Sequence, residues 1–249
     1  MYIPDTNVLI DFGKVSTVRT RLENALRKGV QFTIAPPTLT ELVRGMIASG
    51  EKTFDSDKAI FSWLNKHKPP ILELPRPFMA KLLGASVKTS GVVPKHYEEL
   101  IGLISASANF EEFLKRSQDG VWRDIDRADA IHGSQLDKEH KALFDLAKSG
   151  RGKVAIALSN QFGAPGARPK PVLIAEMFSA AIEFLESSIS KVSSGANTRK
   201  NDPGLYIDFQ LLFYLGDKNL IFLTKENFGN EIKASRQRSR IVGLDALPQ

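Results

Sequence analysis

Four acidic residues of this chain stand at positions from which they could bind one metal ion together: Asp5, Glu41, Asp208 and Glu226. Asp5 follows a short apolar run, and Glu226 comes just after Thr224, which ends another. The carboxyl ends of parallel strands meet at one edge of a sheet, where such sheets bind ligands. Carboxylates that converge there raise one another's pKa unless a cation lies between them. The pattern therefore predicts a site for Mg²⁺ or Mn²⁺, which prefer oxygen ligands.

An ion held in this way could take part in phosphoryl chemistry, because it would bind a phosphodiester oxygen and lower the pKa of a bound water. Thr6 and Asn7 could donate hydrogen bonds to the Asp5 carboxylate or to the ligand that it holds. Asp202 precedes a Pro-Gly pair, which favours a turn. Its closeness to Asp208 in the sequence also makes Asp202 a candidate supporting acid.

Asp5 has a simpler alternative role. An aspartate between a strand and a helix is a common N-cap, because its carboxylate accepts a hydrogen bond from a backbone N–H of the first turn. Taken alone, the junction favours the cap. The other three acids are what favour a metal site.

Strand and helix patterns alternate around these acids. Strands are expected up to residue 4 and over 30–35, 71–74, 219–224 and 240–242, and helices over 11–28, 38–46, 57–66, 78–83, 205–214 and 228–236. Thr38 is a candidate N-cap of its helix, with Glu41 completing a capping box. Such alternation is typical of a parallel sheet.

The alternation stops in the middle of the chain. Helical patterns cover 97–116, 124–148 and 172–192, and strand patterns are scarce between them. We therefore expect a core formed by residues 1–86 and 200–249 and an all-helical insertion or cap formed by 87–199. The expected fold is a three-layer α/β/α sandwich with a central, mostly parallel sheet, to which this insertion is added.

Three parts of the sequence together resemble the PIN-domain nucleases. Residues 3–10, Ile-Pro-Asp-Thr-Asn-Val-Leu-Ile, resemble the opening strand, Asp-Thr-Asn motif and helix of that family. Residues 40–45, Thr-Glu-Leu-Val-Arg-Gly, resemble its second element, a helical Glu shortly before a Gly. Residues 208–215 and 220–228 resemble the closing half, in which a third acid starts a helix and a Thr-x-Asp motif ends the next strand.

The resemblance implies a metal-dependent endoribonuclease that hydrolyses phosphodiester bonds of single-stranded or structured RNA. Many family members are toxins of bacterial toxin–antitoxin pairs. By resemblance, the metal-binding and catalytic acids are Asp5, Glu41, Asp208 and Glu226, and the supporting polar residues are Asn7 and Thr224. The chain departs from the family in having Glu226 where Asp is usual, and in its helical insertion.

Two other functions stay open. A catalytically inactive PIN-like scaffold that binds RNA or a protein would be consistent with Glu226 and with the insertion. An aspartyl-phosphate phosphohydrolase also uses an Asp after its first strand. That chemistry normally needs a second Asp two residues later, where this chain has Asn7.

Composition limits the alternatives further. The 249 residues are 42% apolar and 25% charged, typical of a globular protein with a sizeable core. The absence of cysteine excludes disulfides, thiolate metal sites and cysteine nucleophiles. We find no apolar run long enough to span a membrane and no signal-peptide pattern. We therefore expect a cytoplasmic protein with no membrane partner.

The net charge of +6 is compatible with RNA as a partner. The candidate RNA-binding residues are Arg44, Lys225, Arg236 and Arg238. A cognate antitoxin, another protein or a second copy of the chain in a homodimer are further partners left open.

Overall fold

The computed structural model describes residues 1–85, 91–118, 120–127, 152–162, 168–193, 203–226, 228 and 232–248, and these residues are mainly helical. Their only sheet is small and parallel, with the strand order β1 (Tyr2–Pro4), β2 (Ile221–Leu223) and β3 (Ile241–Val242). The predicted three-layer α/β/α sandwich with a central sheet is therefore wrong.

The prediction overestimated the sheet because two expected strands, 30–35 and 71–74, form only isolated parallel bridges. One bridge pairs Phe32 with Tyr2, and the other pairs Ile34 with Ile71. Prolines limit both segments. Pro36–Pro37 begin a helix immediately after the first, and Pro69–Pro70 and Pro75 bracket the second. Proline has no N–H to give to a ladder and favours the first turn of a helix.

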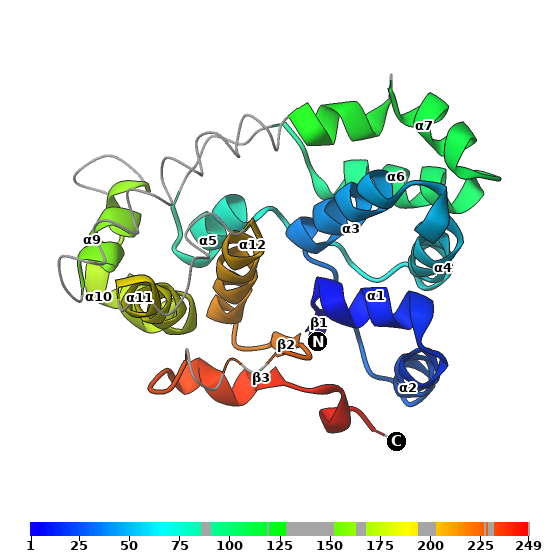
Figure 1. Ribbon diagram of the computed structural model, residues 1–249. Helices are drawn as coiled ribbons and strands as arrows, with labels where there is room; N and C mark the ends of the chain where they lie inside the picture. Colours follow the sequence, from blue (N-terminus) through cyan, green and yellow to red (C-terminus); the bar gives the residue numbers. More distant parts are fainter. Residues whose placement is uncertain are drawn as a thin grey trace.

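Helices fill most of the remaining described chain (Figure 1). They are α1 (Thr6–Lys14), α2 (Ser16–Arg27), α3 (Pro36–Ser49), α4 (Glu51–His67), α5 (Pro75–Leu82), α6 (Pro94–Ala106), α7 (Phe110–Gln118), α9 (Lys153–Asn160), α10 (Pro171–Met177), α11 (Ser179–Ser193) and α12 (Pro203–Leu212), with the 3₁₀ helices η2 (Phe213–Gly216), η3 (Arg236–Arg240) and η4 (Leu244–Ala246). None of these helices has the length and apolar character that crossing a bilayer requires.

The expected helices 11–28, 97–116 and 172–192 are each divided between two helices. Two other local predictions also differ from the structure. The N-cap of α3 is Ala35, and Thr38 is buried inside the first turn, because Pro36 and Pro37 start the helix earlier than the capping-box pattern suggests. The predicted helix 228–236 is also wrong in its described part, where the regular element is η3. The polar run 233–240 has too few apolar residues to pack as a longer helix.

Adjacent strand residues contribute to two separate hydrophobic clusters. Ile3 and Phe222 belong to one cluster, with residues of α5 and α9–α12, whereas Leu223 belongs to the other, with residues of α1–α4 and α6. Strand side chains alternate between faces, so the small sheet lies between the two groups of helices (Figure 1). The described part of 87–199 supplies helices to both clusters. The proposed boundaries of core and insertion stay a prediction.

Helix α1, which follows Asp5, packs closely on α4. A Cβ added at Gly13 would lie 2.5 Å from the backbone oxygen of Ser56. We therefore expect Gly13→Ala to lower the free energy of unfolding by about 1–3 kcal/mol, because one helix must move away from the other. Gly45→Ala is the control, since a Cβ there meets no heavy atom within 4 Å. Urea unfolding should show the loss for Gly13→Ala only, and equal midpoints would contradict the close packing.

Helix α11 holds the segment before η3 through one carboxylate. Glu183 accepts backbone hydrogen bonds at 2.7 Å from Lys233, Ala234 and Ser235. Nearby, the Ala180 N–H donates to the side chain of Gln237 at 2.9 Å. These contacts fix the approach of the chain to η3 and β3.

We expect Glu183→Gln to destabilise the protein by about 1–3 kcal/mol, because an amide has one accepting oxygen and would leave a backbone N–H unpaired. Hydrogen exchange at residues 233–235 should also accelerate. Glu176→Gln is the control, because Glu176 is exposed on α10. Unchanged stability and unchanged exchange in Glu183→Gln would show that the Glu183 contacts do not hold the segment.

Candidate functional site

Asp5 joins β1 to α1 and is almost completely buried, with 4% of its surface exposed. Its N–H donates to the carbonyl of Leu223 in β2 at 2.9 Å, which places it at the carboxyl edge of the sheet. Its Oδ1 accepts from the Val8 N–H at 2.7 Å, so the predicted N-cap is confirmed. Its Oδ2 accepts from the hydroxyl of Thr224. The carboxylate therefore caps α1 and also contacts a residue 219 positions away.

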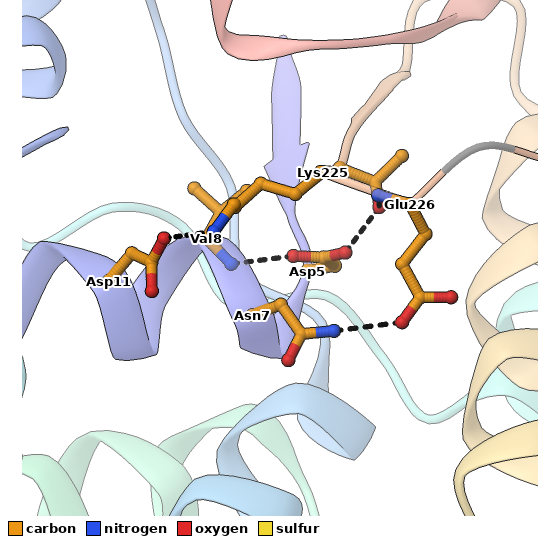
Figure 2. Close-up of polar contacts among 7 residues, drawn as sticks. Asp5, Asn7, Val8, Asp11, Lys225 and Glu226 are labelled. Atoms are coloured by element: carbon orange, nitrogen blue, oxygen red, sulfur yellow. Dashed lines mark hydrogen bonds and ion pairs between the residues drawn. The ribbon is translucent and has the colours of Figure 1, made fainter.

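Thr224 and Glu226 approach Asp5 from the end of β2. The Thr224 N–H donates to Val242 in β3 at 2.9 Å, which fixes the backbone. The Thr224 hydroxyl also accepts from the Glu226 N–H at 3.0 Å. The Glu226 side chain turns back and accepts from the Asn7 amide at 2.9 Å (Figure 2). The predicted supporting residues Asn7 and Thr224 therefore both contact predicted acids.

Glu41 comes from the first half of α3 and is half-buried. Its Oε2 accepts a hydrogen bond from the hydroxyl of Thr6, the first residue of α1. α1 and α3 belong to the same hydrophobic cluster, which brings the start of α1 to Glu41. Three of the four predicted acids therefore surround the start of α1.

Burial and charge raise the pKa of Asp5 to about 6, from an ordinary 3.8. Burial is the largest cause, and the Thr224 and Val8 hydrogen bonds partly oppose it. The negative charges of Glu226 and Glu41 raise the pKa further. A cation near these oxygens would offset both effects, because it favours the ionised carboxylate.

The fourth predicted acid, Asp208, lies on α12 and is half-buried. α12 packs against α3, the helix that carries Glu41. Asp202, the proposed supporting acid, lies outside the described residues. Among the side chains that are described, no group of three or more Asp, Glu or His is arranged so as to hold a metal ion.

The candidate RNA-binding residues lie in different settings. Arg44 forms an exposed ion pair with Asp126 at 3.0 Å. Arg236 and Arg238 are both exposed on η3. Lys225 extends from the end of β2 to α1, where it pairs with Asp11 (Figure 2).

Asp11 contacts a residue of this site and was not among the residues predicted from the sequence. It lies on α1 and holds the Lys225 ammonium. Its position on the same helix as Asn7, about one turn further on, is the signal that could have indicated it. No sequence pattern links Asp11 to Lys225, because their contact joins positions 214 residues apart.

Comparisons of the chain with family models, with curated proteins and with solved structures find no match.

Proposed function

We propose that this chain is a PIN-like, metal-dependent endoribonuclease that uses Mg²⁺ or Mn²⁺. The observation that carries the proposal is the buried carboxylate of Asp5 at the carboxyl edge of the sheet, beside Glu41 and Glu226. Their charges make the site favourable for a cation. The order of motifs along the sequence supports the same assignment.

The donor set fits a hard divalent ion, because the side chains at the start of α1 offer carboxylate, hydroxyl and amide oxygens. Asp5, Glu41 and Glu226 would hold the ion, with Asp208 as a further proposed ligand. Glu41 and Glu226 have long side chains that can turn from Thr6 and Asn7 toward an ion. When bound, such an ion polarises a phosphodiester and supplies an activated water.

The protein's own residues would organise the reaction. Thr224 and the Val8 N–H fix the Asp5 carboxylate, so that it does not need to reorganise when a ligand arrives. Asn7 holds Glu226 near the same edge. The ammonium of Lys225 lies beside this edge and would attract the RNA backbone.

Two alternatives are tested against this proposal. The scaffold that binds RNA or protein without cleavage is favoured by the hydrogen bonds that Glu41 and Glu226 already accept from neutral side chains. The phosphohydrolase is disfavoured, because Asn7 directs its amide to Glu226 and has no acidic proton to give to a leaving group. A cognate antitoxin, another protein partner and a homodimer stay predictions.

The test is an assay with end-labelled single-stranded and structured RNA, in Mg²⁺, in Mn²⁺ and in EDTA. The nuclease should produce internal fragments with 5′ phosphates in either metal and none in EDTA. p-Nitrophenyl phosphate in the same buffers tests the phosphohydrolase. RNA binding without cleavage in every metal would favour the scaffold and contradict the nuclease.

A further inference from the structure

Three consecutive residues at the end of β2 each contact α1 or its N-cap through a side chain. Thr224 contacts the N-cap, and Glu226 contacts the first turn. Between them, Lys225 extends in the other direction along α1 and pairs with Asp11 (Figure 2). The Lys225 ammonium is therefore held against the helix that begins at the acid site.

The place of Asp11 on α1 sets how far this ammonium lies from Asp5. Asp5 precedes the first residue of α1, and Asp11 is the sixth residue of the helix. With a rise of about 1.5 Å per residue, six residues span about 9 Å along the helix axis. The two positions therefore cannot hold the same phosphate oxygen. A ligand that reaches both needs two separate anionic groups, as a nucleic-acid strand has.

The charge of the acid site also calls for a cation beside it. Three carboxylates and one divalent ion, with Asp5, Glu41 and Glu226 as ligands, leave one net negative charge at the start of α1. Each phosphodiester brings a further negative charge, so a strand that enters the site is repelled unless a cation offsets it. The Lys225 side chain is 47% exposed, so a polyanion can reach it. An ammonium has three N–H groups and can contact a carboxylate and a phosphate together.

Asp11 gives the Lys225 side chain a defined position. A lysine has a flexible four-carbon stem, which a fixed carboxylate can hold in one direction. Asp11 lies within a regular helix and is the less exposed partner, at 23%. An exposed ion pair contributes little to stability. The effect of this pair is therefore expected in the position of the ammonium, and its loss should leave the protein folded.

We propose, resting on the proposed function only in taking RNA as the ligand, that Lys225 binds one backbone phosphate of a strand that runs from the acid site along α1. Asp11 is the positioning residue that holds Lys225 there. Because Asp11 and the phosphate share one ammonium, Asp11 weakens the binding of RNA while it fixes the strand for cleavage. Removing the Asp11 charge should therefore tighten binding and slow cleavage.

The first test measures RNA binding in EDTA, where metal-dependent cleavage cannot occur. The probe is a fluorescein-labelled single-stranded decaribonucleotide of mixed sequence, and affinity is measured by fluorescence anisotropy at a series of salt concentrations. Lys225→Met should weaken binding about fivefold at low salt. It should also reduce the slope of log affinity against log salt by about 0.7, the value for one phosphate contact with a single strand.

A second ion pair supplies the matched controls. Lys81 on α5 also pairs with a carboxylate, that of Glu73, at 3.3 Å, and its side chain is exposed. Lys81→Met removes the same charge as Lys225→Met. It should change the affinity by less than about twofold and leave the salt slope unchanged, because a charge remote from the strand is screened.

The second test asks whether Asp11 acts through Lys225. Asp11→Asn should tighten RNA binding in EDTA about threefold when Lys225 is present, and by less than about 1.5-fold when Lys225→Met is combined with it. Glu73→Gln, which removes the carboxylate of the control pair, should have no more than this smaller effect. Circular dichroism checks that all variants are folded.

In Mn²⁺, Asp11→Asn should slow single-turnover cleavage about tenfold in spite of its tighter binding, because the strand is less well placed. Asp11→Glu keeps a carboxylate and should stay within about threefold of the parent. A role in folding alone would not separate binding from cleavage in this way. Cleavage by Asp11→Asn at the parent rate would overturn the positioning role.

The binding results distinguish this inference from the proposed function. A loss of affinity and of salt slope in Lys225→Met, with an Asp11 effect that requires Lys225, supports the inference even if no metal gives cleavage and the nuclease proposal fails. Equal affinities and slopes for the parent and Lys225→Met overturn it, even if RNA is cut in Mn²⁺. An Asp11→Asn effect that is unchanged without Lys225, or no binding of RNA by the parent, overturns it as well.

Discussion

Asp5→Asn should lower RNA cleavage in Mg²⁺ or Mn²⁺ by more than about 100-fold and leave the fold intact. Losing a supporting partner of a metal ligand costs roughly 10–100-fold, and losing a ligand's charge should cost more. The new amide can still accept from the Val8 N–H. In the parent, the Thr224 hydroxyl donates to Asp5. In the variant, the new N–H₂ group can donate to that hydroxyl instead. The substitution therefore removes charge while the local hydrogen bonds can rearrange in place.

The matched control is Asp57→Asn. Asp57 is also buried, accepts a hydrogen bond from a threonine hydroxyl, Thr53, at 2.7 Å, and has a pKa raised mainly by burial. Asp57 lies near Lys14 at the end of α1, whereas Asp5 precedes the first residue of α1. Cleavage should therefore survive in Asp57→Asn. Equal cleavage by the parent and Asp5→Asn would mean that another site or a contaminating nuclease cuts the RNA.

The parts of the site that lie close together in sequence could be predicted from the sequence. Asp5 follows a strand and caps a helix because its side chain needs only the N–H three residues later. The place of Thr224 at the end of β2 also follows a local pattern, an apolar run that stops at a polar residue. The rule that parallel strands share an edge predicted that these chain ends converge, but not the hydrogen bond between the two side chains.

The extent of the sheet could not be predicted in the same way. Apolar residues in 30–35 satisfy a strand pattern, but whether they form a ladder depends on partners and on the helix that begins at Pro36. A local hydrophobic pattern indicates only that side chains are buried. It cannot distinguish a strand from an extended segment between helices, because both bury apolar side chains. The same limit explains why the expected sandwich proved to be a small sheet among helices.

The contacts that charged side chains make with distant parts of the chain also could not be predicted from the sequence. Glu183 binds three consecutive backbone N–H groups, which carry no side-chain signature. The sequence predicts Lys225 as a cation that could bind RNA. In the structure it pairs with Asp11, because α1 and the end of β2 lie side by side. Such pairs depend on the packed arrangement of elements, and the candidate cations look alike until that arrangement is known.

The second large effect concerns the stability of the metal-free protein. The pKa of Asp5 is about 6 when folded, against an ordinary 3.8. The folded state therefore binds this proton more tightly than the unfolded state. Below the ordinary pKa both states are protonated and there is no penalty. As the pH rises from 3.8 to 6, ionisation of Asp5 lowers the free energy of unfolding more and more. Above pH 6 this loss of stability is complete, on the order of 2–3 kcal/mol.

Asp5→Asn should remove this penalty, because its amide does not ionise. In EDTA, the variant should be more stable than the parent by on the order of 2–3 kcal/mol at pH 7.5, and the difference should shrink toward zero near pH 4. Urea unfolding of both proteins across this range measures it. A variant that is less stable than the parent at every pH would show that the carboxylate hydrogen bonds outweigh its burial and repulsion.

Adding Mn²⁺ should close most of the stability difference between the parent and Asp5→Asn at neutral pH. An ion that binds only the folded protein stabilises it by about 2.7 kcal/mol when present at roughly 100 times its dissociation constant. The parent and Asp57→Asn should gain this stabilisation, whereas Asp5→Asn should gain little, because the charge that holds the ion is missing. Thermal unfolding with and without Mn²⁺ measures the gain without any RNA. If Mn²⁺ raises the Tm of the parent and Asp5→Asn equally, the ion binds elsewhere and Asp5 is not its ligand.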